Sequence, residues 1–144
     1  MKRRAGGLRN GVLVDTGPLV ALLNAADKHH ASVARQLALL EPPLITCEAV
    51  LTEATHLVRQ LPGGRAALLE MVDEGFLHIG LQISTQSAEL LTLVKRYASV
   101  PMSLADACLV RLAELHPRNP VWTFDSDFTV YRKNGRHVIA LISP

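Results

Sequence analysis

The chain has 144 residues, of which 49% are hydrophobic and 19% are charged, and its formal net charge is only +2. This composition excludes an intrinsically disordered protein, and no apolar run is long enough to span a membrane. We therefore expect one globular protein of the cytoplasm, large enough to bury a core.

Short apolar strands alternate with helical stretches along the sequence. In chain order, the expected elements are a strand at 11–14, helices at 17–24 and 30–40, a strand at 44–46, helices at 48–60 and 65–74, a strand at 76–79, helices at 84–98 and 103–115, a strand at 121–124, a helical turn at 126–131 and a final strand at 137–142. Strands separated by helices need crossover connections. The pattern therefore predicts an α/β fold with a mostly parallel sheet covered on both faces.

Both ends of the chain are basic. The first group of cations comprises Lys2, Arg3, Arg4 and Arg9, and the second comprises Arg132, Lys133 and Arg136. We expect residues 1–10 to form a flexible basic leader and residues 11–144 to form a single domain. The leader has no apolar stretch after it, which argues against a secretory signal. If the two groups meet in space they form a surface for a polyanion; the alternative is that the leader is a solvated tail.

Five acidic residues lie inside or at the ends of apolar runs, where carboxylates are rare. They are Asp15, Glu53, Asp106, Asp125 and Asp127. Asp15 and Asp125 directly follow expected strands, and ligands of parallel α/β sheets bind beyond the carboxyl ends of the strands. Because converging carboxylates repel one another unless a cation lies between them, this placement predicts a site for a divalent metal ion.

Three of these positions also have a purely structural explanation as helix caps. Asp15 is suited to cap the helix that begins near Gly17, because Asp is a favoured N-cap residue. Ser103 and Asp106 have the spacing of a capping box, in which Ser is the cap and an acid follows three residues later. Either Asp125 or Asp127 can cap the turn that follows. A carboxylate has more than one lone pair, so capping and metal binding are compatible roles.

Glu53 is the acid that capping does not explain. On a helix it shares one stripe with Val50 and Leu57, so we expect its carboxylate to face the apolar side. A buried Glu is rarely unpaired. The structural alternative is therefore a salt bridge, for instance with Arg59 or Arg111.

Four segments carry these acids in a fixed order. They are VLVDTGPLVALLN, TCEAVLTEATHLV, MSLADACLVRLAE and VWTFDSDF. In this order they resemble the PIN-domain family, and most closely the VapC-type toxin ribonucleases of bacterial toxin–antitoxin pairs. The resemblance implies a three-layer fold with a central five-stranded parallel sheet. It assigns Asp15, Glu53, Asp106 and Asp125 to the acidic metal site, Asp127 to a less uniform acidic position, and Thr16 and Thr123 to supporting hydroxyls.

The resemblance also implies a function. It indicates a ribonuclease that depends on Mg²⁺, with Mn²⁺ as the alternative, and that hydrolyses RNA as the toxin of a toxin–antitoxin pair. Its partners would be RNA, a cognate antitoxin and a second copy of the chain in a homodimer. Asp15, Asp106 and Asp125 would anchor the metal, while Glu53 would bind a second ion or orient the attacking water.

Other functions stay open at this point. They are a PIN-type nuclease that is not a toxin, a catalytically silent scaffold that binds RNA or protein, and a phosphatase with an aspartate nucleophile. The phosphatase chemistry typically needs a second Asp two residues after the first, whereas this sequence reads Asp15-Thr16-Gly17. The complete set of acids argues against the scaffold.

Overall fold

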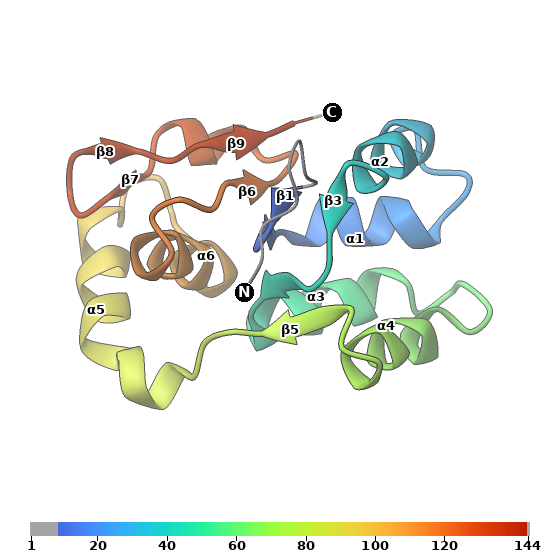
Figure 1. Ribbon diagram of the computed structural model, residues 1–144. Helices are drawn as coiled ribbons and strands as arrows, with labels where there is room; N and C mark the ends of the chain where they lie inside the picture. The colour runs from blue at the N-terminus through green and yellow to red at the C-terminus, as the bar shows by residue number, and fades with distance from the viewer. Residues whose placement is uncertain (1–8, 144) are drawn as a thin grey trace.

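A five-stranded parallel sheet forms the middle of the computed structural model, which describes residues 9–143 (Figure 1). Its strands lie in the order β5-β4-β2-β6-β9. Their bounds are β2 (Leu13–Val14), β4 (Leu44–Thr46), β5 (Leu77–Ile79), β6 (Val121–Trp122) and β9 (Leu141–Ile142). All four pairings between neighbours are parallel, so the expected α/β class and the five-stranded parallel sheet are confirmed.

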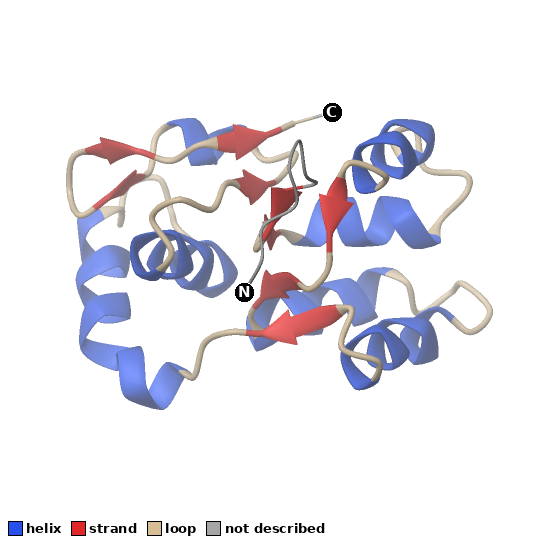
Figure 2. Cartoon of the chain, viewed as in Figure 1, coloured by secondary structure: helices blue, strands red, loops and turns tan. Residues whose placement is uncertain are grey.

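Helices cover both faces of this sheet. They are α1 (Thr16–Leu23), α2 (His30–Leu37), α3 (Glu48–Leu57), α4 (Gly64–Asp73), α5 (Ile83–Arg96) and α6 (Leu104–Leu115), with a 3₁₀ turn, η1, at Ser126–Thr129. Figure 1 shows α5 and α6 on one side of the sheet and α1 to α4 on the other, and Figure 2 shows the strands of the main sheet between these two helical layers. Within the described part of the chain, every helix is too short or too polar to cross a membrane.

Two small strand pairs flank the main sheet. One pairs β1 (Arg9–Asn10) in parallel with β3 (Leu40–Glu41), and the other pairs β7 (Arg132–Lys133) in antiparallel with β8 (His137–Val138). The single final strand expected at 137–142 is therefore wrong, because β8 turns to pair with β7 while β9 joins the main sheet. Residues 1–8 of the expected leader lie outside the described residues.

The core is built around the central strand and α6. Val12, Leu13 and Val14 are fully buried, because β2 lies in the middle of the sheet with helices on both faces. Helix α6 is buried on almost every side, from Ala105 to Val110. The arrangement makes β2 and α6 the rigid elements from which two of the five acids, Asp15 and Asp106, project.

The first turn of α1 packs unusually close to the segment that follows β6. A side-chain carbon at Gly17 would lie 2.9 Å from Cδ2 of Phe124, which is closer than a real contact allows. Only glycine therefore lets the two segments approach this closely. The approach brings the residue after β2, Asp15, and the residue after Phe124, Asp125, to the same edge of the sheet.

The buried position of α6 predicts a contrast between two leucines of this helix. Leu109→Ala should lower the free energy of unfolding by about 2–5 kcal/mol, because Leu109 is fully buried and its truncation leaves a cavity. The matched control Leu115→Ala, at a side chain that is 42% exposed, should cost less than about 1 kcal/mol. Urea denaturation measures both, and equal losses would contradict the assigned core.

Candidate metal centre

A pocket of about 570 Å³ opens at the carboxyl ends of β2, β4 and β6. Its walls are formed by Asp15, Thr16, Gly17, Glu53, His56, Leu57, Ser103, Asp106 and Asp125. Four of the five acids singled out in the sequence line it, although up to 110 residues separate them along the chain. Neither Lys nor Arg is among the described residues that form the wall, so its electrostatic potential is set by carboxylates.

Asp15 is fixed at both of its oxygens. Its Oδ1 accepts a hydrogen bond of 2.8 Å from the backbone N–H of Thr16, which makes Asp15 the N-cap of α1 as expected. Its Oδ2 accepts a hydrogen bond of 2.6 Å from the hydroxyl of Thr123. Burial raises the pKa of Asp15 to about 6, and the charges of Asp106 and Asp125 add to this effect, while the two hydrogen bonds offset part of it.

Asp106 occupies the first turn of α6, the helix that Ser103 caps. The Ser103 hydroxyl accepts a hydrogen bond of 3.0 Å from the backbone N–H of Asp106, so the expected cap is confirmed. The hydroxyl of buried Tyr131 donates to Oδ2 of Asp106 at 2.8 Å. Burial raises the pKa of Asp106, and repulsion from Asp125 adds to the rise, whereas the bond from Tyr131 opposes it. Burial and the neighbouring carboxylate also raise the pKa of Tyr131, so it remains a proton donor.

Asp125 and Asp127 follow β6 and complete an acidic group with Asp106. The side chain of Asp125 accepts from the backbone N–H of Asp127 at 2.9 Å, so Asp125 is the residue that caps η1. Asp106, Asp125 and Asp127 each offer a carboxylate oxygen, and these three oxygens lie within 4.8 Å of one another. Asp15 lines the pocket beside this tight group.

Glu53 approaches the pocket from α3. Its Oε1 accepts a hydrogen bond of 2.9 Å from the hydroxyl of Thr16. The expectation that its carboxylate faces the apolar side is wrong, since the buried stripe of α3 contains Val50, Ala54 and Val58, whereas Glu53 and Leu57 are exposed beside it. Both stripes have helical spacing, and the one that includes the small Ala54 is buried.

The salt-bridge alternative for Glu53 is also not what the structure shows. Arg111 pairs with Glu114 at 3.1 Å, and Arg59 donates to the backbone carbonyl of His56 at 2.7 Å. Within residues 9–143, the Thr16 hydroxyl holds the Glu53 carboxylate through Oε1, and Glu53 lines the pocket. This is the position that a group acting on water or a cation requires.

A hydroxyl holds each of three pocket carboxylates. Thr123 donates to Asp15, Tyr131 to Asp106 and Thr16 to Glu53. The two threonines were identified from the sequence, whereas Tyr131 was not. The sequence offered one indirect indication of its role. Tyr131 lies between an apolar residue and two basic ones, and a Tyr hydroxyl that becomes buried usually finds a hydrogen-bond partner. Nothing in the spacing indicated that this partner would be Asp106, 25 residues earlier.

The donor set fits a hard divalent cation. Carboxylate oxygens are the ligands that Mg²⁺, Mn²⁺ and Ca²⁺ prefer. Burial is the main reason that the pKa values of Asp15 and Asp106 are raised, and repulsion between neighbouring carboxylates adds to the rise. A cation would relieve this repulsion, while the hydroxyls already fix the direction of the carboxylates.

Comparisons with known proteins agree with this fold. A family model described as "PIN domain" matches residues 12–134. A sequence comparison with curated proteins finds no significant match. Among solved structures, VapC20 of Mycobacterium tuberculosis, described as a toxin that cleaves the Sarcin-Ricin loop, superposes with a TM-score of 0.73 at 22% identity, over 83% of this chain and 94% of that one. The structural likeness supports the fold, and the family model spans most of the sequence, including all five acids. The chain belongs to the PIN-domain family.

Proposed function

We propose that this chain is a metal-dependent endoribonuclease that hydrolyses RNA phosphodiester bonds at the acidic pocket. The observation that carries the proposal is the convergence of Asp15, Glu53, Asp106 and Asp125 on one pocket without a lysine or arginine in its described walls. Membership of the PIN-domain family supports it, as does the structural likeness to VapC20, whose description names an RNA-cleaving toxin.

The residues of the pocket divide into those that would hold an ion and those that act on water. Asp106 and Asp125 would hold it, with Asp15 and Asp127 completing the shell. Mg²⁺, or Mn²⁺ in its place, would offset the negative charge that otherwise repels a phosphodiester, polarise a phosphoryl oxygen and acidify water. Thr123 and Tyr131 fix the carboxylates of Asp15 and Asp106, so the shell needs little rearrangement.

Glu53 is the residue suited to orient and deprotonate the attacking water. It is exposed to solvent, it is held by Thr16 through one oxygen, and it lies on the α3 wall of the pocket. In-line attack by water on the phosphorus would leave a 3′-hydroxyl and a 5′-phosphate. Asp125 is kept in place by its own backbone N–H, which donates to the Thr123 hydroxyl at 2.9 Å.

We further propose that the enzyme is the toxin of a toxin–antitoxin pair, with a cognate antitoxin and a homodimeric state. The likeness to VapC20 supports this assignment. Co-expression with the protein encoded by the neighbouring reading frame, followed by size-exclusion chromatography, tests it. A stable complex in which RNA cleavage is suppressed is expected, whereas free elution of the two proteins would leave a PIN-type nuclease that is not a toxin.

Removal of one acid should abolish cleavage without unfolding the chain. Asp106→Asn should reduce the rate of RNA hydrolysis in Mg²⁺ by at least about 100-fold, because a charged ligand of the ion is lost. Its melting temperature should not fall, since the pocket loses repulsion. The matched control Glu89→Gln, at an exposed acid of α5, should cleave like the unmodified protein. Wild-type activity in Asp106→Asn would remove this residue from the mechanism, and absence of cleavage by the unmodified protein would favour a silent scaffold.

The raised pKa of Asp15 predicts how stability depends on pH when a chelator removes metal ions. The folded state binds the Asp15 proton more tightly than the unfolded state, so this residue stabilises the fold below pH 3.8 and loses that contribution as the pH rises to about 6. The rise from 3.8 to about 6 corresponds to about 3 kcal/mol. Denaturation of the unmodified protein and Asp15→Asn should give unfolding free energies that diverge between pH 4 and 7, with Asp15→Asn the more stable at pH 7. Parallel curves of unfolding free energy against pH for the two proteins would contradict the raised pKa of Asp15.

The hydroxyl of Tyr131 should matter for the ion more than for the fold. Tyr131→Phe keeps the edge-to-face contacts with Phe128 and Tyr97 but removes the donor to Asp106. Affinity for Mn²⁺, measured by titration calorimetry, should fall about 10- to 100-fold, with a loss of stability of only about 1 kcal/mol. Tyr97→Phe is the matched control, because the Tyr97 hydroxyl accepts from the backbone N–H of Arg132 and is not the donor to Asp106. Equal Mn²⁺ affinities in both variants would contradict the role of the Tyr131 hydroxyl in positioning Asp106 for the ion.

A further inference from the structure

Five cations gather where the end of α5 meets the β7–β8 hairpin. We call Lys95, Arg96, Arg132, Lys133 and Arg136 the basic strip. The two stretches that supply it, residues 90–105 and 128–144, contain no Asp or Glu. The strip is therefore a local concentration of positive charge in a chain whose net charge is only +2.

Contacts between α5 and the hairpin bring the strip together. The backbone N–H of Arg132 donates to the hydroxyl of Tyr97 at 2.8 Å, immediately after α5 ends. At the tip of the hairpin, a side-chain carbon at Gly135 would lie 3.9 Å from Nη2 of Arg96. Asn134 and Gly135 both adopt left-handed conformations there, with φ of 53° and 81°. The tight turn thus places the guanidinium of Arg96 beside the loop that carries Arg136.

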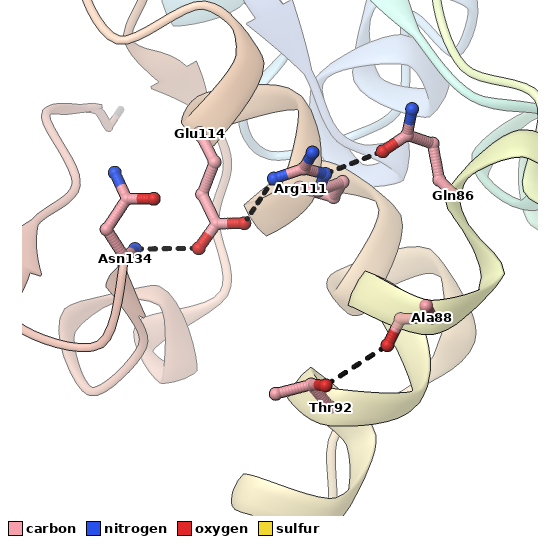
Figure 3. Close-up of polar contacts among 6 residues, drawn as sticks. All are labelled: Gln86, Ala88, Thr92, Arg111, Glu114 and Asn134. Atoms are coloured by element: carbon pink, nitrogen blue, oxygen red, sulfur yellow. Dashed lines mark hydrogen bonds and ion pairs between the residues drawn. The ribbon is translucent and has the colours of Figure 1, made fainter.

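The nearest acid of α6 is already engaged and leaves the strip unneutralised. Glu114 accepts from the backbone N–H of Asn134 at 2.6 Å through one oxygen and pairs with Arg111 at 3.1 Å through the other. Arg111 in turn donates to Gln86 of α5 at 2.7 Å, as Figure 3 shows. This chain of contacts uses the charge of Glu114 to hold the hairpin against α5 and α6.

Three members of the strip are exposed and have no acidic partner among residues 11–143: Lys95, Arg96 and Arg136. Of these, Arg96 and Arg136 lie at the tip of the hairpin. Arg132 and Lys133 have positioning contacts instead. Arg132 donates to the backbone carbonyls of Thr129, Val130 and Tyr131, and Lys133 donates to that of Pro117. They still contribute charge.

The strip begins next to a residue that contacts the acidic pocket. Tyr131, whose hydroxyl binds Asp106 in the first turn of α6, is followed in the chain by Arg132, and the hairpin then runs along α6 to Glu114. We infer that the basic strip binds backbone phosphates of the RNA on one side of the scissile bond, with Arg96 and Arg136 making the direct contacts. This inference rests on the proposed ribonuclease function. Because the contacts are to phosphates, they position the RNA without reading its sequence.

Salt dependence of RNA binding tests the inference. The double variant Arg96→Gln/Arg136→Gln and the unmodified protein would be titrated against a fluorescently labelled single-stranded RNA over a range of KCl concentrations, with chelator present to prevent cleavage. Loss of two phosphate contacts should reduce the slope of log K against log salt by about 1.4 and weaken binding roughly 10- to 30-fold at about 0.1 M salt. Arg96→Lys/Arg136→Lys keeps the charges and should retain the slope.

A matched control separates the effect of the strip itself from the effect of lowering the net charge of the protein. Arg35→Gln/Arg65→Gln removes the same charge from exposed positions on α2 and α4, which lie away from α5 and the hairpin in Figure 1, and should change the slope little. Melting curves verify that each variant is folded. Equal losses in the two glutamine pairs, or an unchanged slope in the strip variant, would overturn the inference. Because binding is measured without metal, an RNA-binding protein that fails to cleave would contradict the proposed function while leaving the strip intact.

Discussion

The burial of neighbouring carboxylates at one edge of the sheet is the constraint around which this structure is organised. Asp15, Asp106 and Asp125 are brought to one edge of the sheet by β2, α6 and β6, and the pKa values of the first two rise because the charges are poorly solvated there. Within residues 9–143, neutral hydroxyls donate to Asp15 and Asp106, and no lysine or arginine pairs with these two carboxylates. Neutral donors fix the carboxylates without cancelling the charge, which is the condition that a cation site needs.

Much of this arrangement could be predicted from the sequence because strands and helices leave strong local patterns. Asp15 and Asp125 follow apolar strands, and in a parallel sheet those strand ends must meet at one edge. Ser103 and Asp106 follow a known capping pattern, which fixes where α6 begins. The family resemblance then related the separate pieces to one fold.

What could not be predicted depends on tertiary contacts. The stretch from His137 to Ile142 is apolar almost throughout, so nothing local shows that it divides between two sheets. The stripes through Glu53 and through Ala54 both have helical spacing, and only packing against neighbouring elements decides which is buried. Tyr131 reaches Asp106 from a distant part of the chain, and such a pairing has no signature in a single sequence.

The buried negative charge of the pocket also makes the stability of the native state depend on the concentration of divalent ions. A carboxylate such as Asp15 that stays ionised in a buried site at neutral pH weakens the native state, and an ion that binds only that state reverses the loss by mass action. The fraction of molecules that are transiently unfolded and open to proteases would then fall as the free concentration of divalent ions rises. Depletion of those ions would shorten the lifetime of the polypeptide and would also stop the proposed RNA cleavage.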